Sequence, residues 1–285
     1  IGLDARGVAF DGVNIWIANW GDSTVTKLRA ADGAHLGTFT VPAGPWGIAF
    51  DGTHMWVANN GAGSVTKLAL DGTIVNSFPV GDKPLGVAFD GANIWVANSN
   101  SNTVSKLRAS DGALLGDFAT GSVPHDVAFD GTHVWVTNVF SDDVTKRRAD
   151  DGSLVGTYPV GPAPFGIAFD GVAIWVVNSG NYHAVRFDPN GTVTKLQASD
   201  GAVMGTYPVG PNPFSVAFDG VSVWVTVEEA NSVRKLRAAD GVSLGLLPSG
   251  GDSIGGGPYG IAFDGNNIWV SNTNSTASKR AVNLR

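Results

Sequence analysis

Residues 45–78 read PWGIAFDGTHMWVANNGAGSVTKLALDGTIVNSF and contain four short segments that are typical of β-strands. The expected strands cover residues 46–50, 55–58, 64–69 and 73–78, and they are rich in aromatic and β-branched side chains. Asp51-Gly52 and Asp71-Gly72 indicate turns, because Asp bonds its own backbone and Gly tolerates positive φ. No helical period is present, so the stretch predicts a four-stranded antiparallel sheet.

This unit recurs along almost the whole chain of 285 residues. The string Ala-Phe-Asp-Gly occurs seven times, with 40, 39, 40, 40, 49 and 45 residues between successive copies, and a Trp follows each Phe six positions later. A sheet that is apolar on both faces needs a neighbour on each side, which a ring of sheets supplies. We therefore predict an all-β fold, a seven-bladed β-propeller of four-stranded antiparallel blades, as one domain over residues 1–285.

Composition excludes several classes of protein. The chain has 18 basic and 25 acidic residues, a net charge of −7, so repulsion from phosphates argues against nucleic-acid binding. No apolar stretch reaches the roughly 18 residues of a membrane helix. The absence of Cys excludes disulfides and zinc–thiolate sites. The Cys-free, Lys-poor, Gly-rich composition favours an exported protein, placed outside the cell, at the cell surface or in the periplasm.

The repeated unit resembles the YVTN family of β-propeller repeats, which are related to NHL repeats. The resemblance rests on Pro-x-Gly-Ile-Ala-Phe-Asp-Gly, then Trp-Val-Ala-Asn, then Thr-Val-Thr-Lys-Leu, and it covers almost the whole chain. It implies a secreted or surface-layer type of repeat protein. Departures from the pattern are Val227 in place of Asn, and Asp126 and Ser215 in place of the first-strand Gly.

Residues present in every copy are explained by the blade itself. We expect the Asp of each Asp-Gly pair to form a turn rather than a metal site. We expect the Lys of each third strand, such as Lys67, to be solvated or paired with a turn Asp. We expect the repeated Trp, such as Trp56, to pack between blades rather than bind a cofactor.

A functional site is expected where the copies differ, and the residue after the Pro at the start of each first strand is such a position. The first strand is the innermost one, so these seven residues should ring one mouth of the central channel. They provide either a binding surface for a sugar, peptide or flat apolar molecule, or packing that plugs the channel. The seven are Arg6, Trp46, Leu85, His125, Phe165, Phe214 and Tyr259.

Two insertions are expected on the same face. Blade five has about nine extra residues within 179–192, which include Tyr182, His183 and Arg186. If residues 192–194 begin the third strand, the insertion is a hairpin on the mouth face; if residues 185–187 form that strand, it lies on the opposite face. The connection 249–257 between blades six and seven is rich in Gly and also falls on the mouth face.

The candidates for catalysis are few. The family resemblance extends to virginiamycin B lyase, a seven-bladed enzyme, and implies a base and a divalent cation held by His and Glu on one face. His125, Glu228 and Glu229 are the residues on the mouth face that match this chemistry, and His183 also falls on that face. The identity of any metal is open, and outside the lyase interpretation no cofactor is expected.

The last copy ends near its third strand, so an outer strand of blade seven is not found in this sequence. Three explanations remain open. Residues that precede this sequence in a longer chain close the ring, the last blade has three strands, or another molecule donates the strand.

These observations predict a non-enzymatic, exported binding or interaction module. Its partner, a small molecule, glycan or protein, would contact the residues at the channel mouth. A metal-assisted lyase or hydrolase on the same face is the first alternative, and a structural component of a cell surface or fibre is the second. Self-association through the open edge of the last blade remains an option, and no nucleic acid or transmembrane segment is expected.

Overall fold

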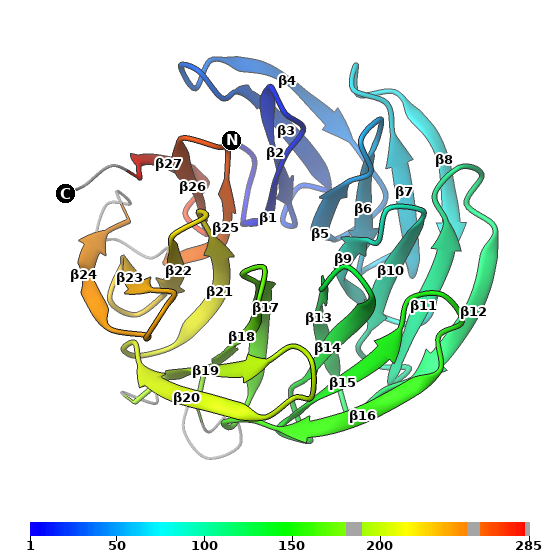
Figure 1. Cartoon of the computed structure of the whole chain (residues 1–285). Coiled ribbons are helices and arrows are strands. Elements are labelled where there is room, and N and C mark those ends of the chain that lie inside the picture. Colours follow the sequence, from blue (N-terminus) through cyan, green and yellow to red (C-terminus); the bar gives the residue numbers. More distant parts are fainter. Residues whose placement is uncertain (181–189, 250–256, 283–285) are drawn as a thin grey trace.

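The computed structural model describes residues 1–180, 190–249 and 257–282, and it is a ring of seven β-sheets around a central channel (Figure 1). The prediction of a seven-bladed propeller is confirmed. In six sheets four consecutive strands pair antiparallel in chain order, and the last sheet has three strands. In the described part of the chain, no helix is long and apolar enough to cross a membrane.

The strands are numbered along the chain, four to a blade, from the channel outward. The first three blades contain β1 (Ala5–Phe10), β2 (Asn14–Asn19), β3 (Thr24–Arg29), β4 (His35–Thr40), β5 (Pro45–Phe50), β6 (Met55–Asn59), β7 (Ser64–Leu68), β8 (Ile74–Pro79), β9 (Pro84–Phe89), β10 (Asn93–Asn98), β11 (Thr103–Arg108) and β12 (Leu114–Ala119). Blades four to seven contain β13 (Pro124–Phe129), β14 (His133–Asn138), β15 (Asp143–Arg148), β16 (Leu154–Pro159), β17 (Pro164–Phe169), β18 (Ala173–Asn178), β19 (Thr192–Gln197), β20 (Val203–Pro208), β21 (Pro213–Phe218), β22 (Ser222–Val227), β23 (Ser232–Arg237), β24 (Ser243–Pro248), β25 (Pro258–Phe263), β26 (Asn267–Asn272) and β27 (Thr276–Ala281).

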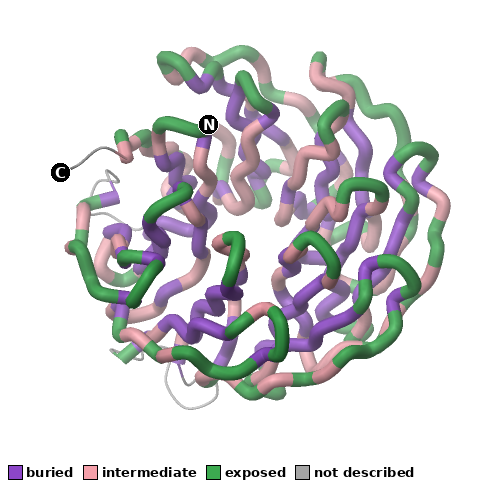
Figure 2. The backbone as a smooth tube through the Cα atoms, viewed as in Figure 1, coloured by how far each residue is buried: buried purple, intermediate pink, exposed green. Residues whose placement is uncertain are grey.

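The core is divided into seven apolar clusters, one between each pair of adjacent blades. Between blades four and five, for example, Trp135 and Val144 pack against Ile167 and Ile174. Figure 2 shows this arrangement as buried backbone in the middle of the blades and exposed backbone at the loops and outer strands. The expectation that the repeated Trp packs between blades is confirmed, since all seven are at most 3% exposed.

The repeated Asp anchors that Trp as well as its turn. In blade four, Asp130 Oδ1 accepts hydrogen bonds from the N–H groups of Thr132 and His133, and Oδ2 accepts one from the indole of Trp135 at 2.8 Å. The indole–carboxylate bond occurs in all seven blades, at 2.7–2.8 Å. The predicted role in turn formation is confirmed, and the same carboxylate also orients the core Trp.

The predicted pairing of the repeated Lys with a turn Asp is wrong, and of the seven Lys only Lys279 is exposed to solvent. In blade four Lys146 is only 1% exposed; its Nζ donates to the backbone carbonyls of Ala198 and Ser199 in the next blade and lies 4.8 Å from the Trp135 ring centre. Each blade uses its Lys in this way, as a cation that joins it to the next turn. The first acceptor in each case is Leu70 for Lys27, Ala109 for Lys67, Ala149 for Lys106, Ala198 for Lys146, Ala238 for Lys195, Val282 for Lys235 and Ala30 for Lys279.

The ring closes between blades seven and one. Strand β25 lies against β1, as each innermost strand lies against the next. The hydroxyl of Ser271 donates to the carbonyl of Arg6, and Lys279 donates to the carbonyls of Ala30 and Ala31. These contacts join residues about 250 positions apart in the chain and hold the channel together.

Candidate functional site

A bulge in each innermost strand forms the lining of the channel. In blade two, Pro45 pairs with Asn59 and Ile48 pairs with Val57, so β5 contains one extra residue relative to β6 at Trp46-Gly47. All seven blades show the same shift. Bulges redirect side chains, and Trp46, Gly47 and Ile48 all line the channel. The regular alternation of side chains between the two faces of a strand is therefore interrupted at the mouth end of β5.

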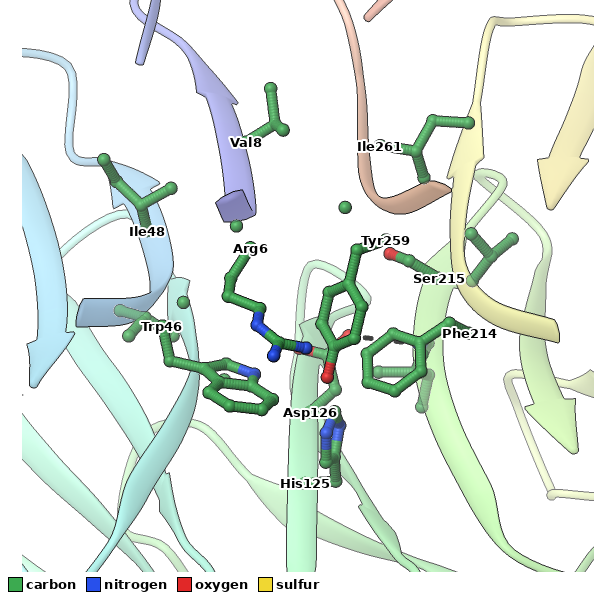
Figure 3. A pocket seen from close by; sticks show the side chains of 18 of the residues that line it. Arg6, Val8, Trp46, Ile48, His125, Asp126, Phe214, Ser215, Tyr259 and Ile261 are labelled. Carbon is green, nitrogen blue, oxygen red and sulfur yellow. Dashed lines mark hydrogen bonds between the residues drawn. The ribbon is translucent and has the colours of Figure 1, made fainter. Parts of the chain in front are cut away.

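In most innermost strands the residue that follows the mouth residue is Gly, such as Gly47 after Trp46, and this small residue lets adjacent blades approach each other at the axis. A Cβ on Gly47 would lie 2.3 Å from the carbonyl oxygen of Leu85 in the next blade, so neighbouring backbones touch there. Asp126 and Ser215 occupy this position in blades four and six. The result is a cavity of about 170 Å³ along the axis, bordered by Arg6, Trp46, His125, Phe214 and Tyr259 at the mouth (Figure 3).

The predicted mouth residues come together, and their rings close the channel rather than only surround it. The ring centres of Phe214 and Tyr259 are 3.6 Å apart, those of Phe165 and Phe214 are 4.8 Å apart, and those of Trp46 and Tyr259 are 5.6 Å apart. We call Arg6, Trp46, Leu85, His125, Phe165, Phe214 and Tyr259 the aromatic cap. Leu85, His125 and Tyr259 are buried, whereas Trp46, Phe165 and Phe214 remain half-buried. The cap thus packs over the channel and leaves part of the surface of these three rings exposed.

Arg6 places a positive charge inside this cap. Its guanidinium carbon lies 4.2 Å from the ring centre of Tyr259, 4.8 Å from that of Trp46 and 5.9 Å from that of Trp20. Its Nη2 donates to Asp4 at 2.8 Å. Burial raises the pKa of Tyr259 well above its usual value, so the phenol remains neutral beside the guanidinium.

His125 and Asp126 are neighbouring ionisable residues at the channel, and their pKa values are shifted in opposite directions. Burial, and to a lesser extent the charge of Arg6, lowers the pKa of His125 to about 3. The His125 ring is therefore neutral near pH 7, and its Nδ1 has no hydrogen-bond partner within the described ranges. Burial raises the pKa of Asp126 to about 6, although its carboxylate accepts hydrogen bonds from the N–H groups of Val127 and Ile167. Asp126 borders the cavity, where solvent can reach it.

The residues predicted as candidates for catalysis lie in different environments: His125 lies within the aromatic cap, whereas Glu228 and Glu229 lie in a loop. The ring of His125 contacts Trp46, Phe165 and Phe214. Glu229 is exposed in the loop between β22 and β23 and accepts a hydrogen bond from Asn212, and the half-buried Glu228 lies in the same loop. Over the part of the chain that the structure covers, no group of three or more His, Asp or Glu side chains is arranged to hold a metal ion.

The insertion in blade five lies between strands β18 and β19. The third strand is β19, which pairs Asn178 with Thr192, so the alignment that began this strand at residue 192 is confirmed and the alignment with residues 185–187 is wrong. Asn178 pairs on its other side with Pro164, at the mouth end of the blade. Tyr182, His183 and Arg186 lie outside the described residues, as do residues 250–256 of the Gly-rich connection.

Sequence reasoning missed two aromatic residues of this face. Trp20 and Phe140 are 42% and 43% exposed, and they are the aromatic members of the set of exposed large apolar side chains in the described chain. Both lie in loops between the second and third strands, at the end of the blade where the innermost strand begins, and the Trp20 ring is 5.9 Å from Arg6 of the cap. The available signal was their position: most other blades have Asn, Ser, Thr or Gly there.

Comparison with known proteins yields the fold. No family model matches the chain and no curated protein matches it, so the resemblance to YVTN and NHL repeats stays a prediction. A catalytically inactive virginiamycin B lyase from Staphylococcus aureus with quinupristin is similar over 98% of this chain and 95% of that chain, with a TM-score of 0.82 and 20% identity.

Two other solved structures are similar along nearly their whole length. The hydrazine synthase of Kuenenia stuttgartiensis has a TM-score of 0.85 and 18% identity, covering 100% of this chain and 98% of that chain. A streptogramin B lyase structure has a TM-score of 0.81 and 20% identity, covering 98% and 94%. At these identities the likeness establishes a shared propeller fold and leaves the chemistry of the site to its own residues.

Proposed function

We propose that the protein is a binding module that holds a ligand or a protein segment against the aromatic cap. The observation that carries this proposal is the gathering of half-buried and exposed rings on one face. Trp46, Phe165 and Phe214 of the cap are half-buried, and Trp20 and Phe140 are exposed in loops on the same face, with the Trp20 ring 5.9 Å from the guanidinium of Arg6. Aromatic side chains gathered on one face are typical of a recognition site.

The charge around the cap favours a cationic ligand. The described loops on the mouth face contain six acidic side chains and one basic side chain, Lys83, while Arg6 within the cap is paired with Asp4. Aromatic faces bordered by carboxylates attract cations that also carry an apolar group. The six acidic residues are Asp4, Asp22, Asp82, Asp142, Glu228 and Glu229.

A pair of small fragments tests this proposal. Benzylamine and benzyl alcohol share a ring and differ in charge, and fragments of this size bind with dissociation constants on the order of millimolar. We expect benzylamine to shift the indole N–H resonances of Trp20 and Trp46 at lower concentration than benzyl alcohol, while the seven core indoles stay fixed. The resonances are assigned with Trp20→Phe and Trp46→Phe.

Charge variants provide the control. Glu229→Gln should weaken benzylamine binding and leave benzyl alcohol unchanged, whereas Asp151→Asn, an exposed carboxylate on the opposite face, should change neither. The proposal is wrong if neither fragment shifts Trp20 or Trp46. A methyl glucoside that bound more tightly than benzylamine would keep the site and overturn the preference for a cation.

A further inference from the structure

Asp126 is a departure from the repeat that the aromatic cap does not explain. The residue after the mouth residue is Gly in five of the seven innermost strands, and it is Asp126 in blade four and Ser215 in blade six. Asp126 borders the channel cavity (Figure 3), and no salt bridge within the described residues involves it. The other ionisable residues that line this cavity are Arg6, His125 and Tyr259.

These lining residues leave one negative charge unbalanced. The guanidinium of Arg6 is paired with the carboxylate of Asp4 at 2.8 Å. His125, with a pKa of about 3, is neutral near pH 7, and Tyr259 is neutral because burial raises its pKa. Asp126 has a pKa of about 6 and is mostly ionised at that pH. A carboxylate in such a confined site favours a ligand that carries a positive charge.

The backbone register directs hydrogen-bonding groups into the same cavity. In blade four the N–H of Asp130 donates to the carbonyl of His133, and Val127 pairs with Val136 further along the same ladder. Hydrogen-bonded and non-hydrogen-bonded pairs alternate along an antiparallel ladder, so the pair formed by Val127 is a non-hydrogen-bonded one. Its N–H and C=O therefore point away from β14. Because β13 has no neighbouring strand on that side, they face the channel.

The same register occurs in every blade, so seven backbone N–H groups face the channel. Two of them hold the Asp126 carboxylate: Oδ1 accepts from Val127 at 2.9 Å, and Oδ2 accepts from Ile167 of the next blade at 3.2 Å. The channel wall thus already binds one carboxylate. The seven residues, all of which line the cavity, are Val8, Ile48, Val87, Val127, Ile167, Val216 and Ile261.

The equivalent N–H groups in blades one and two, those of Val8 and Ile48, lie on the positive side of the channel. Arg6 precedes Val8 by two residues on β1, and its guanidinium lies against the ring of Trp46, which begins β5. Blade four, which contains Asp126, is across the ring from blade one (Figure 1). A second carboxylate bound at Val8 and Ile48 would be repelled by Asp126 unless its ligand also carried a positive charge.

We propose that the channel beneath the cap binds a small zwitterion of the amino-acid type, with its ammonium group on Asp126 and its carboxylate on the N–H groups of Val8 and Ile48. The cavity of about 170 Å³ has room for on the order of ten waters, so a ligand of about five to seven non-hydrogen atoms fits. The unpartnered Nδ1 of His125, a residue only 7% exposed, offers a further acceptor beside Asp126. This site is separate from the exposed ring surface of the cap and does not depend on the ligand proposed there.

A series of zwitterions tests the proposal. Glycine, β-alanine and 4-aminobutyrate share their charged groups and differ in the distance between them. At pH 7.5 we expect at least one of them to shift the amide resonances of Val8 and Ile48. Its dissociation constant should be about tenfold or more below those of propylammonium and propionate, each of which engages one charged group. The indole resonance of Trp20, which does not line the cavity, should stay fixed.

The pH dependence of the wild type and a charge variant locate the ammonium group. Lowering the pH to 5 protonates Asp126 and leaves His125 and Tyr259 neutral, so binding of the tightest zwitterion should weaken about tenfold. Asp126→Asn should weaken it at pH 7.5 by about tenfold or more and make propionate bind more tightly than propylammonium. Asp151→Asn, at an exposed carboxylate on the opposite face, should change neither.

Three results would overturn the proposal: no zwitterion shifts Val8 and Ile48, a single-charge probe binds as tightly as the best zwitterion, or Asp126→Asn leaves binding unchanged. The seven core indole resonances show whether the variant is folded. A failure of benzylamine to shift Trp20 and Trp46 would instead count against the function proposed for the cap, so the two failures are distinguishable.

Discussion

Trp135→Ala is expected to lower the free energy of unfolding by about 3–5 kcal/mol, the range for removing a large aromatic side chain from a packed core. Trp135 is fully buried in the cluster between blades four and five. Its loss removes the packing of Val144 and Ile174, the ring contact with Tyr158 at 5.5 Å, and the indole hydrogen bond to Asp130. Urea unfolding followed by circular dichroism measures the change.

Two further variants separate the contribution of the indole hydrogen bond from that of the buried ring. Trp135→Phe keeps an aromatic ring and removes the bond to the Asp130 carboxylate, so a loss of about 1–3 kcal/mol is expected. Trp20→Ala, at a side chain that is 42% exposed, should cost less than about 1 kcal/mol. Equal losses for Trp135→Ala and Trp20→Ala would contradict the assignment of the repeated Trp to the core between blades.

His125→Phe is expected to alter the dependence of stability on pH. Because folding lowers the pKa of His125 from 6.5 to about 3, the unfolded chain binds a proton at this residue that the folded chain does not. The stability that neutral His125 contributes is therefore present above about pH 6.5 and is lost as the pH falls. Between pH 8 and pH 5 the wild type should lose about 2 kcal/mol relative to the variant.

The titration of Asp126 changes the stability of the fold in the opposite direction to that of His125, so the two contributions must be measured separately. Folding raises its pKa to about 6, so the folded chain binds the extra proton, and stability falls as the pH rises toward 6. His125→Phe is therefore measured in both the wild-type and the Asp126→Asn background, and the expected difference is the same in each. His35→Phe, at an exposed outer-strand residue, is the matched control. A His125→Phe variant with the pH dependence of the wild type would show that the ring is not buried in the cap.

The ring of blades follows from the sequence because the turn and the hydrogen bond between the repeated Asp and Trp both form within a single blade. The Asp-Gly turn and the Trp that Asp anchors are five residues apart, as in Asp130 and Trp135, so a local pattern carries them. The repeated Lys was misread because its acceptors are backbone carbonyls in the next blade, as with Lys146 and Ala198, 52 residues away. A sequence does not show which carbonyls a lysine can reach.

The composition of the mouth could also be predicted, whereas its closure could not. Phe214 and Tyr259 start adjacent innermost strands, so their shared location follows from the topology. Their 3.6 Å contact depends on the bulge that turns the first residues of each innermost strand into the channel. The position of Arg6 between Trp46 and Tyr259 likewise depends on convergence of three separate blades. The exposed Trp20 and Phe140 were missed because loops lack the regular spacing of strands.

Hydrogen exchange of the nine tryptophan indole N–H groups tests most directly the claim that repeated residues build the ring and variable residues build the mouth. The seven indoles bonded to turn carboxylates should exchange slowly and together with global unfolding, because each is buried and hydrogen-bonded. Trp20 and Trp46, on the mouth face, should exchange much faster. A spectrum in which any of the seven exchanges as fast as Trp20, or in which Trp20 and Trp46 are as protected as the seven, would contradict this division.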